Sequence, residues 1–225
     1  MILDYGCGFG GNYNFLSKRG VYFGLDILED NINYAKNRYT RVNFKVFDGK
    51  TIPFPDGYFD EVHAYDVLEH VEDLDKVLSE VSRVLKKGGK FFITIPAAVS
   101  EKALINIKPN YFEEVGHKRI VDPKYLINWS KRGFEILTNN KCRGMEAVVL
   151  SIVFWFNKNR RSVKYQTGSP EFSKMLVAFI WLFDSRLFRT NLKYFFFIYI
   201  FTLPVGYLIS RIFPKTIYLV LKKNV

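Results

Sequence analysis

The chain has 225 residues, enough for one α/β domain with a full core and an appendage. Its two cysteines, Cys7 and Cys142, argue against a disulfide-rich secreted scaffold and suit a reducing compartment. Residues 1–100 carry 12 basic and 14 acidic side chains, whereas residues 101–225 carry 21 basic and 8 acidic ones. The net positive charge is therefore confined to the second half of the chain.

The first hundred residues alternate between apolar runs and amphipathic segments. The pattern predicts strands at 1–5, 21–27 and 42–48, a strand with its exit loop at 61–71, and a strand at 90–96. It predicts helices at 11–19 (with Phe15 and Leu16 inward), at 31–39, and at 73–87 with Gly88 and Gly89 as the stop. Such alternation indicates a doubly wound α/β fold with a parallel sheet, whose ligands bind beyond the carboxyl ends of the strands.

The second half is less regular. A helix is predicted at 123–134, a strand at 134–140, and a last strand at 216–223. Between them, residues 145–213 are hydrophobic and helix-like. We therefore divide the chain into a core at 1–144, a hydrophobic helical insert at 145–214, and a final core strand at 215–225.

A glycine-rich turn follows the first strand, in the stretch DYGCGFGG. Glycines there allow a tight strand-to-helix turn and close approach of a ligand. Gly6, Gly8 and Gly11 formally satisfy the dinucleotide fingerprint, and Asp26 follows about 20 residues on, where it can bind ribose hydroxyls. The motif alone leaves two alternatives: a nicotinamide dehydrogenase, or an enzyme that uses another nucleoside cofactor.

Two carboxylates favour the second alternative. Asp4, two residues before the first glycine, is well placed for a cationic amine and badly placed beside a phosphate. Asp48, at the end of the third strand, can accept a hydrogen bond from an adenine amine. With Asp26, these acids describe a ligand that has an amine, a ribose diol and an adenine, and no phosphate.

These motifs, with YDVLEHVEDLDKVLSEVSRVLKKGGKFFITIP further on, resemble the class I S-adenosylmethionine-dependent methyltransferases of the type 11 branch, which includes ubiquinone-pathway O-methyltransferases. The resemblance covers about residues 1–96, and TIYLVLKK at the end resembles the last strand of that family. It implies a Rossmann-like seven-stranded sheet with an antiparallel last strand. S-adenosylmethionine is the implied cofactor.

The resemblance also implies a cofactor site at consecutive strand ends. Its residues would be Asp4, Gly6, Gly8 and Gly10 for the methionine moiety, Asp26 for the ribose diol, Ile27, Asp48 and Gly49 for the adenine, and Tyr65 and Asp66 beside the methionine and the methyl group. Two plainer interpretations stay open. Gly8 could serve only the turn, and Asp48 could only cap the following loop.

His70 and His117 are the candidate acid–base residues, because a hydroxyl acceptor has to lose a proton. Related quinone O-methyltransferases carry the same Glu-His pair at the position of His70, and His117 falls where related enzymes bring a loop over the acceptor. Each histidine could instead make an ordinary loop hydrogen bond. Alignment of the acceptor can suffice without a base. A metal bound by Asp66, Glu69 and His70 is the weaker alternative, and we expect none.

The insert points to a membrane surface. Residues 194–209 are too few for a span, and a single span would leave the last strand on the wrong side. A two-helix hairpin at 175–188 and 194–210 would carry charges at its tip. We favour an interfacial arrangement with Lys158, Arg160, Arg161 and Lys164 near anionic headgroups; the alternative is a helical lid over the active site.

We therefore expect a methyltransferase that acts on a lipophilic or lipid-linked acceptor, peripheral on the cytoplasmic face of an anionic membrane, with no nucleic-acid partner. The alternatives are an inactive membrane-associated scaffold and a soluble small-molecule methyltransferase with a lid. Members of the family normally have several tens of residues before the first strand, including a helix that closes over the cofactor. We expect that such residues are missing here, or that the insert replaces them.

Overall fold

The computed structural model describes residues 1–107, 109–142 and 214–225. These fall into two compact units, each described by itself. The main unit comprises residues 1–98, 118–140 and 216–225, and the described residues of the second unit are 99–107, 109–117, 141–142 and 214–215. The hydrophobic insert predicted at 145–214 lies outside the described residues except for Pro214, so the division of the chain at 144 and 215 stays a prediction.

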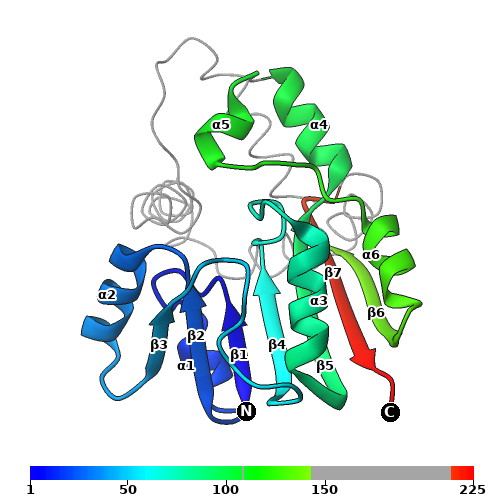
Figure 1. The fold of residues 1–225 in the computed structure, drawn as a ribbon. Coiled ribbons are helices and arrows are strands. Elements are labelled where there is room, and N and C mark those ends of the chain that lie inside the picture. Colours follow the sequence, from blue (N-terminus) through cyan, green and yellow to red (C-terminus); the bar gives the residue numbers. More distant parts are fainter. Residues whose placement is uncertain (108, 143–213) are drawn as a thin grey trace, which may run out of the picture. The chain divides into compact units, whose positions relative to one another are not determined.

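A single seven-stranded sheet runs through the main unit in the order β3-β2-β1-β4-β5-β7-β6 (Figure 1). Its strands are β1 (Ile2–Tyr5), β2 (Tyr22–Asp26), β3 (Asn43–Val46), β4 (Phe59–Tyr65), β5 (Leu85–Pro96), β6 (Phe134–Cys142) and β7 (Thr216–Lys223). Neighbouring pairs from β3 to β5 are parallel, and β7 is antiparallel to β5. The predicted doubly wound sheet with an antiparallel last strand is confirmed. The strand order reverses between β1 and β4, which is where such sheets bind ligands.

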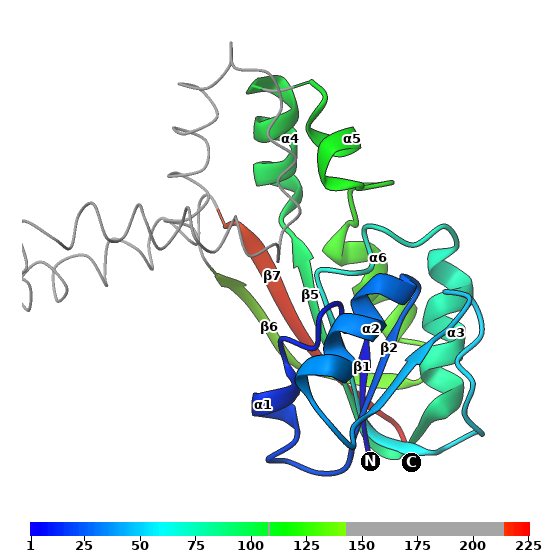
Figure 2. The ribbon, with the colours of Figure 1, turned by 90° about the vertical axis from the view of Figure 1, so that its left-hand side faces the viewer.

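The helices of the main unit cover both faces of this sheet. They are α1 (Tyr13–Leu16), α2 (Glu29–Arg38), α3 (Leu74–Val84) and α6 (Pro123–Ser130). Figure 2 shows α1 on one side of the sheet and α3 on the other. Two apolar clusters fill the two faces: one joins Leu16 of α1 with Ile32 of α2, and the other joins Val81 of α3 with Leu126 of α6.

Three local predictions were wrong. The first helix spans only four residues, and although Leu16 is fully buried, Phe15 is 60% exposed. Helix α3 ends at Val84 rather than at the Gly88-Gly89 pair, because Leu85 already pairs with Phe59 as the first residue of β5. Two helices that the sequence pattern did not predict, α4 (Ala98–Ile107) and α5 (Tyr111–Val115), follow β5.

Arg83 organises the amino-terminal end of the parallel strands. Its guanidinium donates to both carboxylate oxygens of Glu80, at 2.7 and 3.0 Å, and to Asp56 at 2.8 Å. It also donates to the backbone carbonyls of Ile52 and Phe54. These contacts, above all the bonds from Arg83, lower the pKa of Glu80 to about 2. The loop between β3 and β4 is thereby fixed to α3.

Candidate cofactor site

The glycine-rich turn leaves β1 in left-handed backbone conformations. Gly6, Gly8 and Gly10 have φ angles of 73°, 51° and 74°, which L-residues with a Cβ rarely adopt. A Cβ on Gly6 would lie 2.5 Å from Val67 Cγ2, and one on Gly10 would lie 3.0 Å from Phe44 Cζ. A Cβ on Gly8 would meet nothing within 4 Å. Gly6 and Gly10 therefore serve packing, whereas Gly8 borders open space.

Asp26 ties the end of β2 to this turn. Its Oδ2 accepts from the Gly8 backbone N–H at 2.9 Å, and its Oδ1 accepts from the Leu28 N–H at 2.9 Å and from Asn31 Nδ2 at 3.1 Å. A carboxylate has about four acceptor positions, so three donors leave capacity for a ligand hydroxyl. The predicted pairing of Gly8 and Asp26 at one site is thus present. Open space beside a carboxylate with spare acceptor capacity fits a ribose diol.

Asp4 is buried beneath the turn. Its carboxylate is 1% exposed and accepts from the Tyr22 hydroxyl at 2.8 Å and from Asn12 Nδ2 at 3.3 Å. Burial raises the pKa of Asp4 to about 6, and the nearby charge of Asp26 adds to the rise, against the hydrogen bonds from Tyr22 and Asn12. Direct contact of Asp4 with the methionine moiety stays a prediction. The contacts show that Asp4 orients Asn12, whose amide nitrogen is turned toward it.

The loop after β3 lies against the ends of β1 and β2. The Tyr5 hydroxyl donates to the Gly49 carbonyl at 3.1 Å, and a Cβ on Gly49 would lie 3.0 Å from Ile27 Cγ2. Ile27 is 60% exposed, an apolar surface at the position predicted for adenine. Asp48 Oδ1 accepts from the N–H groups of Lys50 and Thr51. These bonds lower the pKa of Asp48, and they show that it does cap the following loop.

At the end of β4, two predicted residues are held in fixed positions. Asp66 has a φ of 53°, its N–H lies 3.0 Å from the carbonyl oxygen of Thr94, and its Oδ1 accepts from the Thr94 hydroxyl at 3.0 Å. The Tyr65 hydroxyl lies 2.8 Å from His63 Nδ1. The ends of β1, β2, β3 and β4 thus carry all ten residues that were predicted to bind the cofactor.

Sequence reasoning missed the residues that orient these groups. Asn12 and Asn31 were not singled out, although Asn12 directly follows the glycine turn and Asn31 lies in the first turn of α2, where such side chains commonly cap backbone groups. His63 was also missed, because a histidine within a strand gives no local signal. Its role depends on a contact with Tyr65 two residues along the same face of β4.

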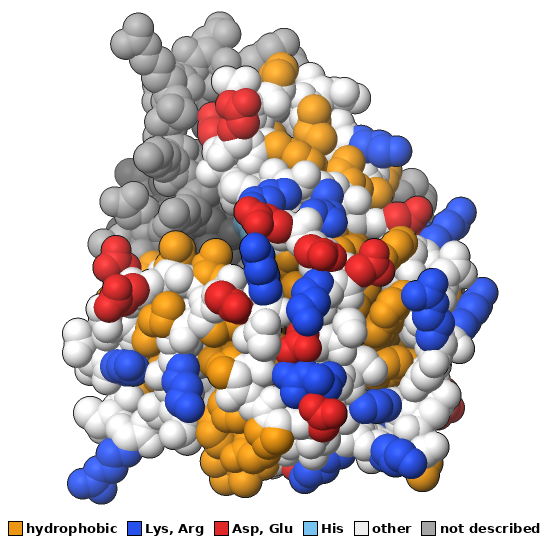
Figure 3. Space-filling model, in the orientation of Figure 1, with side chains coloured by type: hydrophobic (Ala, Val, Ile, Leu, Met, Phe, Trp, Pro, Cys, Tyr) orange, Lys and Arg blue, Asp and Glu red, His pale blue; other side chains and the backbone are white. Residues whose placement is uncertain are grey.

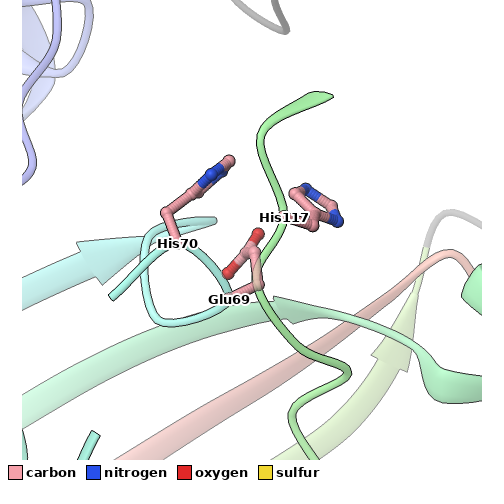
Figure 4. A group of neighbouring side chains, drawn as sticks. All are labelled: Glu69, His70 and His117. Atoms are coloured by element: carbon pink, nitrogen blue, oxygen red, sulfur yellow. The ribbon is translucent and has the colours of Figure 1, made fainter. Parts of the chain in front are cut away.

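The two candidate acid–base histidines, His70 and His117, are labelled in Figure 4. They belong to different units. His70 follows β4, and its backbone N–H donates to the Val67 carbonyl at 3.0 Å. His117 follows α5, and its Nδ1 lies 2.8 Å from Glu101 Oε2 within the second unit. The next residue, Lys118, donates its backbone N–H to the Glu69 carbonyl at 2.9 Å. Their predicted catalytic roles stay predictions.

Comparisons with known proteins agree with this fold. The model of the methyltransferase domain family matches residues 3–93. The chain is 30% identical over 151 residues to a fatty-acid O-methyltransferase of Mycolicibacterium smegmatis, a match that covers 64% of this chain and 49% of that relative. It is 33% identical over 106 residues to a sarcosine/dimethylglycine N-methyltransferase of Halorhodospira halochloris, covering 42% and 37%. The chain therefore spans about half or less of these relatives.

The sheet topology is also that of a solved structure. A SAM-dependent methyltransferase from Archaeoglobus fulgidus superposes with a TM-score of 0.56 at 20% identity, covering 99% of this chain and 85% of that one. At this identity the likeness shows the fold alone. Together with the glycine–acid geometry, the family match identifies residues 3–93 as a class I S-adenosylmethionine-dependent methyltransferase domain, whose cofactor is S-adenosylmethionine.

Proposed function

We propose that the chain transfers a methyl group from S-adenosylmethionine to a lipophilic or lipid-linked acceptor, as a peripheral protein on the cytoplasmic face of an anionic membrane. The observation that carries the cofactor assignment is the Gly8 turn, where Asp26 holds the Gly8 N–H and a Cβ on Gly8 would meet no atom of the described residues within 4 Å. When bound, the cofactor supplies an electrophilic methyl group on a positively charged sulfonium.

The chain's own groups divide the work of holding that cofactor. Asp26 accepts from the ribose hydroxyls, and the exposed side chain of Ile27 packs on the adenine. Asp48 Oδ2 accepts from the adenine amine, since both loop-capping bonds go to Oδ1. Tyr65 and Asp66 border the methionine end. The pinned Asp66 backbone keeps that end rigid, which favours in-line attack by the acceptor.

A lipophilic acceptor is supported by two features of the sequence and by one relative. Residues 145–213 contain apolar and aromatic runs such as YFFFIYIF, with basic residues before them. The Mycolicibacterium relative, matched over 64% of this chain, is named for action on fatty acids. Among the described helices, none combines the length and apolar character needed to cross a bilayer.

One face of the molecule supports a lipid rather than a nucleic-acid partner. On the face drawn in Figure 3, basic side chains stand among acidic ones. A nucleic-acid surface would gather cations along one track. We assign the excess positive charge to residues 101–225 facing anionic lipid.

His70 and His117 are the proposed acid–base groups for an acceptor that must lose a proton. A carboxylate acceptor such as a fatty acid needs no such base, because it is already ionised near neutral pH. An alcohol or phenol acceptor does need one. Replacing each histidine by Gln therefore separates the two acceptor classes: the rate on a carboxylate should stay within about threefold, and the rate on a phenol should fall about 100-fold.

The acceptor class can be tested by methyl transfer from methyl-labelled S-adenosylmethionine. Palmitate in vesicles of phosphatidylglycerol and phosphatidylcholine is compared with butyrate in solution, which offers the same carboxylate without the chain. We expect label in the palmitate ester only. Equal labelling of butyrate would contradict the lipophilic acceptor. Labelling of neither, by a protein that binds the cofactor, would contradict a fatty acid as the acceptor.

Membrane contact can be tested by vesicle flotation. We expect the protein to float with vesicles that contain phosphatidylglycerol and to remain below with vesicles of phosphatidylcholine alone, because each basic residue near an anionic surface contributes about 1 kcal/mol. High salt should weaken the association. A protein that stays in solution with both vesicle types would contradict the proposed location.

A further inference from the structure

A continuous hydrogen-bonded row of side chains lies along one face of β4, outside the residues assigned above except for its last member. Arg19 donates to both oxygens of Glu61, at 2.7 and 3.1 Å. Glu61 Oε2 lies 3.0 Å from His63 Nε2, and His63 Nδ1 lies 2.8 Å from the Tyr65 hydroxyl. Residues two apart on a strand share a face, so this row runs from the exposed Arg19 to the end of the strand.

The hydrogen bonds of this row determine which atom of each side chain carries a proton. The guanidinium of Arg19 and the imidazole of His63 offset the partial burial of Glu61 and lower its pKa, so Glu61 is a carboxylate that can only accept. His63 Nε2 must therefore carry the proton. Burial lowers the pKa of His63 to about 4, so the ring is neutral near pH 7 and its Nδ1 is an acceptor. It follows that Tyr65 donates its only hydroxyl proton to His63.

Packing holds the ring at the centre of this row. His63 is 1% exposed, and its ring is stacked on Phe92 of β5 with centroids 4.4 Å apart and planes at 4°. Arg19 lies over the same Phe92 ring at 5.5 Å. Burial also raises the pKa of Tyr65, so its hydroxyl remains protonated. A buried neutral imidazole held on both sides has little freedom to change its tautomer or its orientation.

The row ends at Tyr65, which the proposed function assigns to the methionine end of the cofactor site. Tyr65 is the last residue of β4 and directly precedes the pinned Asp66. His63 pairs in register with Asp4 of β1, the strand that leads into the glycine turn. Because its proton is committed to His63, the Tyr65 oxygen can offer a ligand only lone pairs. An acceptor of this kind favours a cation over a neutral group.

We propose that Glu61 and His63 are positioning residues that hold the Tyr65 hydroxyl as an obligate acceptor for the sulfonium end of the cofactor. This inference rests on the proposed function. It gives the protein a means of preferring the cationic substrate form, S-adenosylmethionine, over the neutral product, S-adenosylhomocysteine. The two ligands share the adenosine and the amino acid and differ only in the methyl group and its charge.

The test compares the affinities of both ligands by calorimetry, with no methyl acceptor present. Tyr65→Phe should weaken binding of S-adenosylmethionine by about tenfold and binding of S-adenosylhomocysteine by less than about twofold, because only the cationic sulfonium is attracted by the oxygen lone pairs that the variant lacks. The ratio of the affinity for S-adenosylmethionine to that for S-adenosylhomocysteine is the readout. His63→Phe, which can keep the stacking on Phe92, should lower this ratio by at least about threefold. Tyr58→Phe, a half-buried tyrosine before β4, is the matched control and should leave the ratio unchanged.

The outcomes separate this inference from the proposed function. If the wild-type chain binds neither ligand, the proposed function fails. If it binds both and Tyr65→Phe leaves the ratio unchanged, or weakens both ligands equally, only the inference fails.

A second measurement uses only the wild-type protein, so it does not depend on whether a variant folds. Long-range ¹H–¹⁵N spectra of the wild-type protein should show His63 protonated at Nε2 alone. A proton on Nδ1 would overturn the inference, because Tyr65 would then be free to donate to the ligand.

Discussion

The two ends of the central sheet use acidic residues in opposite ways. At the amino-terminal end, Glu80 and Asp56 meet the guanidinium of Arg83, which also satisfies two backbone carbonyls. At the carboxyl-terminal end, the hydrogen bonds to Asp4 and Asp26 come from amide, hydroxyl and backbone N–H groups. Among the described residues, no Lys or Arg forms a salt bridge with either acid.

This difference indicates which end of the central sheet binds a ligand. Charge that is neutralised within the protein serves stability, as at Arg83. Charge that is oriented by neutral donors and left without a cation keeps its attraction for one. The mutual repulsion of Asp4 and Asp26 contributes to the raised pKa of Asp4, and a cationic ligand would relieve it. A glycine with an open side, Gly8, lies beside these acids.

The largest expected effect is on stability at the amino-terminal end. Arg83→Met should lower the free energy of unfolding by about 3 kcal/mol, because the buried Glu80 carboxylate loses its guanidinium partner and keeps only Lys76 at 3.5 Å and the Ile52 N–H. Urea denaturation measures this loss. Lys86→Met, which removes an exposed ion pair with Asp60, is the control and should cost at most about 1 kcal/mol. Equal losses in the two variants would contradict the structural role of Arg83.

The same contacts predict a pH dependence. The pKa of Glu80 is lowered to about 2 in the folded state, from an ordinary value of 4.5. Its contribution to stability is therefore fully present above pH 4.5 and is lost as the pH falls toward 2. In Arg83→Met, the free energy of unfolding should fall less between pH 4.5 and pH 2 than it does in the wild type. An unchanged acid profile in that variant would show that the shift of Glu80 has another cause.

At the carboxyl-terminal end the expected effect is on affinity instead. Gly8→Arg should weaken S-adenosylhomocysteine by more than about 100-fold, because the side chain occupies the open space and the φ of 51° is strained. Gly57→Arg is a matched control before β4, with a φ of 61° and equally open space. It carries similar backbone strain but should change the affinity by less than about twofold. Calorimetry measures the affinity of both variants. Equal losses of affinity would contradict the assignment of the space beside Gly8 to the cofactor.

Asp4→Asn should move stability and binding in opposite directions. The folded-state pKa of about 6 lies above the ordinary 3.8, so the buried carboxylate destabilises the wild-type fold increasingly as the pH rises from 3.8 to 6. At pH 8 the variant should be more stable by about 1–3 kcal/mol, with no gain below pH 4. Its affinity for S-adenosylhomocysteine should fall about tenfold. A variant that loses stability at pH 8 would contradict the cost assigned to Asp4.

The smallest expected effect is at the exposed Asp48. Asp48→Asn retains an oxygen that can cap the loop and loses the charge that would attract the adenine amine. We expect about a threefold lower affinity and an unchanged melting temperature. A drop in melting temperature with unchanged affinity would assign Asp48 to the loop alone.

The sequence predicted the parts of the site that depend on chain order. The glycines after β1 and the acids at Asp26 and Asp48 follow apolar runs, and parallel strands bring their carboxyl ends together, so their meeting could be foreseen. The contacts that orient them could not. Tyr22 reaches Asp4 because β1 and β2 pair in a register that puts Ile2 opposite Tyr22, and no local pattern encodes that register.

The wrong helix boundary has a similar cause. Residues 85–87 continue the helical pattern of α3, but Leu85 pairs with Phe59, and the pairing of β4 and β5 shifts between Phe59 and Glu61. Sheet pairing therefore outcompeted local helix propensity. In the four-residue α1 only Leu16 is buried, and its neighbour Phe15 points to solvent. Helices α4 and α5 lack a clear apolar period and escaped prediction.

The most direct test of the central claim is a calorimetric titration of the wild-type chain with S-adenosylhomocysteine. The account predicts saturable, one-to-one binding in the micromolar range that is lost in Gly8→Arg and retained in Gly57→Arg. A folded wild-type chain that binds no ligand, or binding that survives in Gly8→Arg, would contradict the assignment of the Gly8 and Asp26 turn as the cofactor site.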